Sequence, residues 1–362
     1  MSTTSLALAL FSFIPSILAV SATFNGPITS SQHLYNIPSW HSHNFSCIGS
    51  PQAYAIRTSL GKGLGVFATR VLEPGAVIFR EDPVILIHPP QFRDGVGYPL
   101  SGIEQQLRTA FDALPELKKA EVLGLTAHYT TAETASLDDV DELIPIFRSN
   151  AYNSGNQIGL YPKIARINHS CRPNTSYLWV ARHGKLVVVA SRHIDEGEEL
   201  SISYVPLLLS HEDRQKRLDQ YGFKCSCDAC ALGKDELDAS DKRRKIIHQT
   251  LANLTPHLAL GVPESKSGKK RAQERADASF ELVKIVEEEQ LLDYYAQVYR
   301  IAAILHARTE DWESATKFAH KSYQIHWMAD EESEMTIEMQ TLTAMFIESW
   351  NNNLRDKLMR KG

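Results

Sequence analysis

The chain has little cysteine and no strong excess of either charge. Its 362 residues carry a formal net charge of −5, so the composition gives no reason to expect a strongly basic nucleic-acid-binding protein. Five cysteines in a chain of this length do not resemble the dense disulfide framework of a small secreted protein. Three of them occur within Cys225-Ser-Cys227-Asp-Ala-Cys230, a spacing that is more typical of a metal site.

The sequence also lacks an apolar run long enough for a comfortable membrane span. Its apolar run at residues 5–20 is interrupted by Pro15 and followed by Ser21 and Ala22, which resemble a cleavage site. No Lys or Arg precedes this run, but its length is that of a signal-peptide core. We therefore expect no transmembrane span, and we interpret residues 1–22 as a signal-like segment.

A hydrophobic content of 43% in 362 residues allows a sizeable core and predicts two domains. Short apolar runs separated by Gly and Pro begin at residue 54 and favour a small β fold. Apolar residues recur at helical spacing within 101–149 and again after Cys230, so the pattern predicts an α+β chain. The predicted segments are a signal-like segment at 1–22, a low-order lead-in at 23–53, a β-rich domain at 54–205 with a helical insert at about 100–149, a cysteine-containing segment at 206–232 and a helical region at 233–362.

Two features of the helical region are more specific. The stretch from Gly261 to Gly268 contains Pro and Ser and is predicted to be a flexible break between helices. Residues 299–325 place alanines and aromatics at the spacing of a helix pair around Asp311 and Trp312, which resembles one tetratricopeptide unit. A single unit does not establish a repeat array, so we expect a helical bundle.

The stretch RINHSCRPN at residues 166–174 stands out as a candidate site. Its Asn, Ser and Pro residues favour turns and local backbone hydrogen bonds, so it is a poor helix or strand interior. The flanking segments 159–165 and 175–182 are typical of buried or half-buried extended chain. A polar turn that contains a thiol between two apolar segments indicates a functional site.

Four stretches together resemble the SET-domain protein-lysine methyltransferases. They are GKGLGVFA (61–68), RINHSCRPN (166–174), EELSISY (198–204) and YGFKCSCDAC (221–230), and they occur in the order of that family. The resemblance covers about residues 54–230. It implies a pseudoknotted, β-rich SET fold with a post-SET zinc segment. The helical C-terminal region is similar to the SET-and-MYND subgroup, but the interval 69–150 contains no Cys/His-rich MYND finger.

The resemblance implies that S-adenosylmethionine is the cofactor and indicates which residues hold it. Lys62, Gly63 and Leu64 lie in a Gly-rich turn, where backbone N–H groups and an ammonium could hold a carboxylate. The alternative for this turn is a tight hairpin with an exposed Lys. Asn168 and His169 match cofactor-contacting positions, partly through main-chain atoms, although their side chains could instead satisfy buried backbone groups.

Asn150 matches a further cofactor-contacting asparagine of the subgroup. Its alternative interpretation, a helix C-cap, stays open at this point.

Three aromatic residues match the family's active site. Tyr204 corresponds to its active-site tyrosine and is assigned both a catalytic and a cofactor-binding role. Tyr221 is a second catalytic candidate that would line the lysine channel, and Phe223 a cofactor-packing one. Without the resemblance, Tyr221 and Phe223 would be interpreted as plain core aromatics.

The three thiolates of Cys225, Cys227 and Cys230 are one ligand short of a closed tetrahedral zinc site. Cys171, inside RINHSCRPN, is the candidate for the fourth ligand, and the subgroup resemblance supports it. Cys47, His211 or a ligand from another molecule are the alternatives. A site of four thiolates would be structural, because no coordination position stays open for catalysis.

These assignments predict a protein-lysine methyltransferase that acts on a protein presenting a lysine, with a histone in chromatin as one candidate. The alternative is a catalytically inactive, SET-derived scaffold that binds partners through its helical region. The chemistry favours the nucleus or cytoplasm, whereas residues 1–22 favour secretory entry. The basic clusters at 242–245 and 269–271 resemble a split nuclear-import signal, but we interpret them as solvated charges. The sequence shows no direct nucleic-acid motif and leaves the oligomeric state open.

Overall fold

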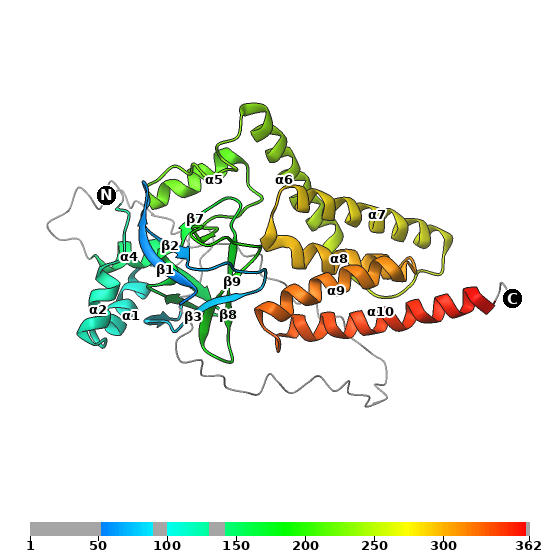
Figure 1. Cartoon of the computed structure of the whole chain (residues 1–362), viewed down its shortest axis with the longest axis horizontal. Coiled ribbons are helices and arrows are strands. Elements are labelled where there is room, and N and C mark those ends of the chain that lie inside the picture. The colour runs from blue at the N-terminus through cyan, green and yellow to red at the C-terminus, as the bar shows by residue number, and fades with distance from the viewer. Residues whose placement is uncertain (1–51, 90–99, 130–141, 360–362) are drawn as a thin grey trace.

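The computed structural model of the chain describes residues 52–89, 100–129 and 142–359. In Figure 1 the strands lie between the helices of the insert on one side and the C-terminal helices on the other. The coarse prediction of an α+β chain with a β-rich part and a mostly helical C-terminal region is confirmed. The signal-like segment, the lead-in up to residue 51, Cys47 and part of the predicted insert lie outside the described residues.

The described strands form four small sheets. The pair β1–β2 and the triplets β3-β9-β8 and β4-β6-β5 are antiparallel, whereas β7 and β10 pair in parallel. The strands are β1 Tyr54–Ser59, β2 Gly63–Ala68, β3 Val77–Glu81, β4 Ile85–Ile87, β5 Ala151–Ser154, β6 Gln157–Leu160, β7 Asn168–His169, β8 Thr175–Val180, β9 Lys185–Ala190 and β10 Ser201–Ile202. β9 is central in its sheet, and its residues 186–190 are all buried, which explains its continuous apolar run.

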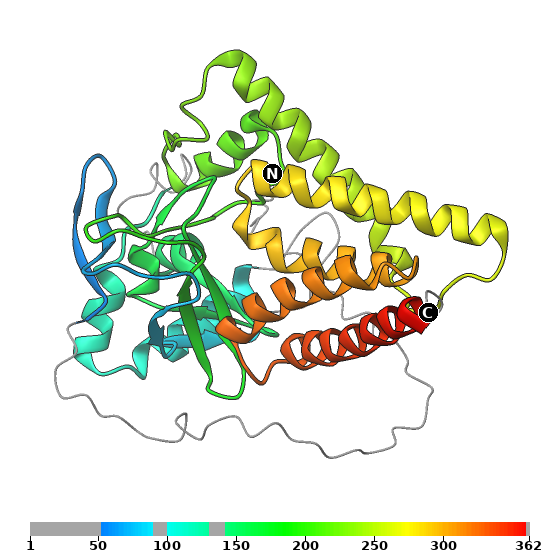
Figure 2. The ribbon, with the colours of Figure 1, turned by 45° about the vertical axis from the view of Figure 1, so that its right-hand side comes forward.

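Helices occupy the insert and the C-terminal region. The described helices are α1 Leu100–Asp112, α2 Glu116–Leu123, α4 Leu143–Asn150, α5 His211–Leu218, α6 Lys234–Leu254, α7 Lys266–Glu288, α8 Tyr295–Ala307, α9 Trp312–Ala329 and α10 Glu334–Met359. Short 3-10 turns are η3 Ile164–Arg166, η4 Asp219–Tyr221, η5 Thr255–His257 and η6 Leu292–Tyr294. α7 packs on α8, α8 on α9 and α9 on α10, and Figure 2 shows these helices side by side. Among these described helices, none is long and apolar enough to cross a membrane.

The C-terminal predictions hold at the level of helix pairs but not at every boundary. The pair α8–α9 lies where the tetratricopeptide-like spacing is found, and the Asp311 side chain accepts a hydrogen bond from the Ser314 N–H to cap α9. The predicted break at 261–268 is wrong at its end. Ser265 caps α7 by accepting from the Gly268 N–H, so Gly268 lies in the first turn of the helix.

The stretch RINHSCRPN is not simply a turn. Asn168 and His169 form β7, which pairs with Ser201 and Ile202 of β10. The Ser170 N–H then donates to the Ile202 carbonyl at 2.9 Å and extends this pairing. The prediction of a turn is therefore wrong at these two residues, because parallel pairing with a distant segment supplies the backbone partners that local sequence does not reveal.

The same stretch crosses between two hydrophobic cores. Ile167 belongs to the core of the β-rich part, whereas Cys171 belongs to the core of the helical region. Both side chains are fully buried. A third core packs the insert helices on β4 and β6. Because only four positions separate the residues of the first two cores, the local conformation at 167–171 sets how the two parts meet.

A buried carboxylate fixes the start of this crossing. Glu81, at the end of β3, accepts hydrogen bonds from the N–H groups of Lys163 (2.9 Å) and Ile164 (2.8 Å) at the beginning of η3. Burial raises the pKa of Glu81, and the two backbone donors oppose that rise. The carboxylate thus joins β3 to the chain just before β7.

We expect Glu81→Ala to lower the free energy of unfolding by about 1–3 kcal/mol, because two buried N–H groups lose their acceptor. Urea unfolding followed by far-UV circular dichroism measures this change. The control is Asp82→Ala, whose exposed carboxylate contacts the Lys185 ammonium and should contribute about 0.5 kcal/mol or less. Equal losses in the two variants would contradict the assigned role of Glu81.

Candidate active site

The Gly-rich turn is a tight hairpin between β1 and β2. Gly61 and Gly63 have φ values of 73° and 78°, a conformation that side chains rarely adopt. Lys62 lies between them, and its Nζ is 3.0 Å from Oε2 of Glu199. The lysine side chain is 45% exposed. The backbone therefore forms the tight hairpin of the alternative interpretation. The ammonium of Lys62 is paired with the carboxylate of Glu199.

Gly65 is the glycine of this motif that permits a close approach. A Cβ at this position would lie 2.5 Å from Oε1 of Glu199 and 3.0 Å from Nδ2 of Asn168. Asn168 donates to the Leu64 carbonyl at 3.1 Å and to Oε1 of Glu199 at 2.6 Å. The hairpin, β7 and the segment before β10 thus meet at Gly65.

Glu199 is the central residue of this arrangement. Partial burial alone would raise the pKa of its carboxyl, but hydrogen bonds from Asn168, Lys62 and Ser59 lower it below its ordinary value. The carboxylate is therefore ionised at neutral pH and holds an ammonium and an amide at one position. The sequence analysis missed this residue, although it lies within the quoted EELSISY motif.

His169 faces the cysteines with its side chain. Its Nδ1 accepts a hydrogen bond from the Tyr204 backbone N–H at 3.0 Å, and its Nε2 lies 3.4 Å from the Cys171 Sγ. Because a backbone N–H can only donate, the proton of the neutral ring is on Nε2, which donates toward the sulfur. The imidazole therefore connects Tyr204 to Cys171.

The predicted aromatic residues lie together. The ring centroid of Tyr204 is 5.1 Å from that of Tyr221 and 6.3 Å from that of Phe223. The Tyr204 hydroxyl donates to the Ile167 carbonyl at 2.6 Å. Tyr204 and Tyr221 also line a cavity of about 30 Å³. The other residues around this cavity are Ser149, Asn150, Ala151, Tyr152, Ala165, Tyr177 and Ser203.

Tyr204 and Tyr221 are neutral at physiological pH. Burial, followed by the charges of Tyr221 and Glu199, raises the pKa of Tyr204 far above its ordinary value. Burial and then Tyr177 raise the pKa of Tyr221 to about 12. Neither hydroxyl can therefore act as a strong base near pH 7, but each can orient a polar group.

Asn150 lines the same cavity and ends helix α4. Its Nδ2 donates to the carbonyls of Ile146 and Thr126, both at 2.8 Å. The side chain thus satisfies backbone groups at the helix end. The C-cap of α4 is Ala151, so Asn150 is the last helical residue and not the C-cap of the alternative interpretation. Both of its hydrogen bonds use the amide nitrogen, so the amide oxygen can accept from a ligand.

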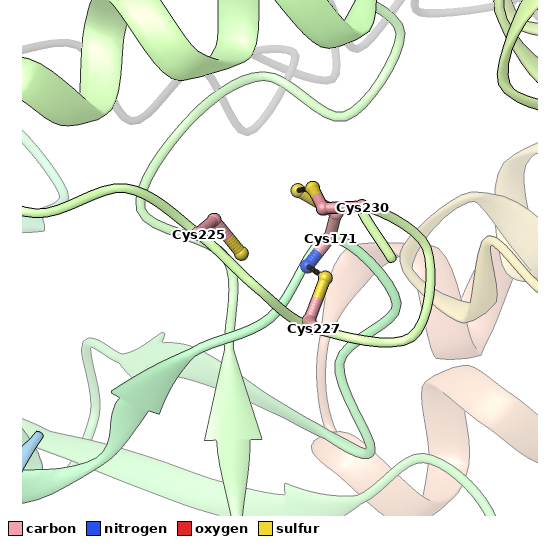
Figure 3. A group of neighbouring side chains, drawn as sticks. All are labelled: Cys171, Cys225, Cys227 and Cys230. Atoms are coloured by element: carbon pink, nitrogen blue, oxygen red, sulfur yellow. Dashed lines mark hydrogen bonds between the residues drawn. The ribbon is translucent and has the colours of Figure 1, made fainter. Parts of the chain in front are cut away.

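Four cysteines converge beside the aromatic group. The sulfur atoms of Cys171, Cys225, Cys227 and Cys230 all lie within 4.8 Å of one another, and Figure 3 shows the four side chains grouped around one position. The sulfurs of Cys171 and Cys230 are 3.6 Å apart, and the Cys171 N–H donates to Cys227 Sγ at 3.4 Å. All four are free thiols, of which Cys171 is buried.

The cysteine group matches the predicted ligand set. Hydrogen bonds with Cys171 first, then with Cys225 and Cys230, lower the pKa of Cys227, so the group readily holds a thiolate. His211, one of the alternatives for the fourth ligand, lies within hydrogen-bond distance of Gln215 and is not part of the group. Four sulfur donors at these separations suit a divalent, thiophilic metal ion.

We expect Gly65→Ala to displace the side chains of Glu199 and Asn168 and to lower the free energy of unfolding by about 1–3 kcal/mol. Thermal and urea unfolding of the full chain measure the loss. Gly261→Ala is the control, because an added Cβ there meets no atom within 4 Å. A Gly65→Ala variant as stable as Gly261→Ala would contradict the close approach.

Comparison with known proteins agrees with this geometry. Residues 63–205 match the SET domain family. The histone-lysine N-methyltransferase set5 of Schizosaccharomyces pombe is 30% identical over 197 residues, which are 54% of this chain and 56% of that protein. The histone-lysine N-methyltransferase SMYD3 of Homo sapiens is 44% identical over 82 residues, which are 22% of this chain and 19% of that protein.

A longer but weaker match is the N-lysine methyltransferase SMYD2 of Bos taurus, which is 25% identical over 258 residues, 66% of this chain and 58% of that protein. The chain thus spans little more than half the length of the fission yeast and bovine proteins. The region matched by the family contains β2, β7, Glu199 and Tyr204. Residues 63–205 of the chain thus match the SET domain family, and the relatives named above are described as lysine methyltransferases.

Proposed function

We propose that the chain transfers a methyl group from S-adenosylmethionine to the side chain of a lysine in a protein substrate. The observation that carries this proposal is the small cavity lined by Tyr204 and Tyr221, of which Tyr204 donates its backbone N–H to His169 of β7. The relatives named as histone-lysine methyltransferases support the same reaction class and make histones the first substrates to test.

The cavity suits the attack of a neutral amine. A lysine has an ordinary pKa of about 10.4, so a site of this kind must favour the uncharged amine. When bound, the cofactor would supply an electrophilic sulfonium methyl group. Tyr204 and Tyr221 stay protonated, so in this mechanism they orient the amine and exclude water, and they do not remove its proton. A space of about 30 Å³ admits a group of the size of a methyl.

The residues proposed to hold the cofactor lie in the Gly-rich hairpin, in β7 and beside the cavity lined by Tyr204. They are Lys62, Gly63, Leu64, Asn150, Asn168, His169, Tyr204 and Phe223. Leu64 and Phe223 expose 43% and 36% of their surface, respectively, and a ligand with an aromatic base would cover such apolar groups. The Lys62 ammonium already contacts Glu199, so a ligand carboxylate would have to share it.

The cysteine group is proposed to hold one structural zinc ion. Cys171, Cys225, Cys227 and Cys230 complete a closed set of four sulfur ligands, which leaves no position for catalysis. The His169 Nε2–H would donate to the Cys171 sulfur, as residues around metal ligands commonly do. In this arrangement the zinc ties the post-SET segment, with Tyr221 and Phe223, to the stretch 166–174.

The experiment that tests the function is a methyl-transfer assay with the full chain, radiolabelled S-adenosylmethionine and histones or a cell lysate. Incorporation that depends on the chain supports the proposal, and analysis of the product identifies the methylated lysine. Cofactor binding without incorporation on any of these substrates would contradict it. We place the reaction in the nucleus or cytoplasm, and the mass of the mature N-terminus tests that placement.

Tyr204→Phe should lower the rate of methyl transfer by about 100-fold, the order expected when one oriented polar group is removed from a reacting centre. Cofactor affinity, measured by isothermal titration calorimetry, should change little. Tyr161→Phe is the control, since its buried hydroxyl contacts Ser154 outside the cavity. Unchanged turnover in Tyr204→Phe would remove this hydroxyl from the mechanism.

Cys171→Ser should release zinc and loosen residues 221–230, because the buried ligand from RINHSCRPN is lost. Elemental analysis should find one zinc per wild-type chain and less than one in the variant. Hydrogen exchange should become faster in the segment 221–230. One tightly held zinc in Cys171→Ser would contradict the four-cysteine assignment.

A further inference from the structure

A second cavity lies outside the candidate active site. It has a volume of about 910 Å³ and is bounded by the segment 206–210, by α5, by α6 with η5, and by Tyr294 and Gln297. Among the described residues, none lines both this cavity and that of Tyr204 and Tyr221. Its volume is in the range of small-molecule pockets, whereas a stable protein partner would have to cover about 1,000 Å² of surface or more. The cavity is therefore a candidate site for a small ligand.

The walls of this cavity are mainly apolar. Leu208 and Leu209 line it from the segment before α5, and Leu251 and Ala252 line it from α6. Leu251 and Tyr294 also belong to the hydrophobic core of the helical region, so close packing holds this part of the wall in place. A ligand that covers these side chains gains the free energy of apolar burial. The body of the ligand should therefore be apolar.

Two carboxylates at the cavity already have partners within the chain. Both oxygens of Asp241 accept a hydrogen bond from the His211 N–H, at 2.8 and 2.9 Å. The Asp241 carboxylate also lies 3.7 Å from the buried guanidinium of Arg214. An oxygen of Asp213 accepts from the Ser210 hydroxyl at 2.7 Å. Both carboxylates thus help to hold the beginning of α5 and do not call for a cationic ligand.

The basic cluster 242–245 of α6 contains two arginines that are paired inside the protein. The buried carboxylate of Glu289 contacts Arg243 at 2.5 Å and Arg244 at 3.4 Å. It also contacts Arg172 at 3.5 Å, so three guanidiniums share it. Arg244 is fully buried. The interpretation of the cluster as solvated charges is therefore wrong for Arg244.

The two lysines of the same cluster face the cavity. Lys242 and Lys245 are exposed, and both line the cavity together with His248. Within residues 52–89, 100–129 and 142–359, neither ammonium pairs with a carboxylate. Side chains three positions apart are neighbours on a helix, so both ammoniums can approach one anionic group. The charged groups of the cavity that are left for a ligand are therefore cations.

We propose that this cavity binds a small organic carboxylate with a long apolar body, of which a medium-chain fatty acid is the simplest example. The carboxylate lies between Lys242 and Lys245, where it accepts charge-assisted hydrogen bonds. The apolar body covers Leu208 and Leu251. A cationic ligand of the same shape is repelled by the two ammoniums. The inference is independent of the proposed methyl transfer, because the cavity shares no described residue with that of Tyr204.

Isothermal titration of the full chain with decanoate, below its micelle concentration, tests the site. Decylammonium is the matched probe, because it carries the same apolar chain with the opposite charge. The wild-type chain should bind one decanoate. It should bind decanoate at least about tenfold more tightly than decylammonium, because the two ammoniums attract one head group and repel the other.

The lysines are tested by the double variant Lys242→Met, Lys245→Met. Decanoate should bind it at least about tenfold more weakly than it binds the wild-type chain, and the affinities for the two probes should come within about threefold of each other. This loss of charge discrimination separates a head-group site from a merely apolar surface. Lys266→Met is the control, since Lys266 is exposed at the start of α7 and does not line the cavity.

The cavity itself is tested by Ala252→Trp, which places a large side chain inside it. Decanoate binding should be lost, while Tm stays close to that of the wild-type chain because Ala252 is exposed. Ala259→Trp is the matched control at an exposed position outside the cavity and should bind decanoate normally.

A wild-type chain without saturable decanoate binding would overturn the inference, and so would equal affinities for the two probes. Unchanged decanoate affinity in the double lysine variant or in Ala252→Trp would also overturn it, since the ligand would then bind elsewhere. Methyl transfer is not a readout here. A chain that binds decanoate as described but methylates nothing would support this inference while contradicting the proposed function.

Discussion

Four positions separate Ile167, in the core of the β-rich part, from Cys171, in the core of the helical region. The chain cannot rotate freely over so short a distance when both ends are buried, so the relation between the two parts is fixed here. Glu81 holds the chain before this crossing, the pairing of β7 with β10 holds the middle, and Arg244 donates to the Cys171 carbonyl at the far end. The aromatic cavity and the cysteine group lie on either side of it.

The candidate site is ordered largely by contacts within the chain. Glu199 holds Lys62 and Asn168, and His169 connects Tyr204 to Cys171. These contacts orient the side chains before any ligand arrives, which lowers the entropy that binding must remove. Asn168 can therefore both satisfy groups within the chain through its side chain and contact a ligand, because its internal hydrogen bonds fix its orientation.

Sequence patterns located most of the elements and grouped the site residues, because hairpin turns, apolar spacing and CxCxxC depend on neighbours in sequence. They did not reveal the two-residue strand at Asn168, whose partner is more than thirty positions away. Glu199 was not singled out, because EELSISY alone does not show which carboxylate lies beside Asn168. Arg244 was interpreted as a solvated charge, because a helical repeat shows which face is apolar but not that a guanidinium is buried on it. Burial of charge is decided by tertiary packing and is invisible locally.

The positions of the arginine partners imply an order of assembly. A ribosome completes Cys171 long before Cys230, and it completes Arg244 and Glu289 later still. The cysteine group can therefore close only after residues 225–230 have emerged, and the cations around it lack their shared carboxylate until α7 is finished. Until then, the candidate site contains Tyr204 but lacks Tyr221 and Phe223 beside it. Completion of the wall formed by Tyr221 and Phe223 thus becomes one of the last steps in the formation of the folded chain.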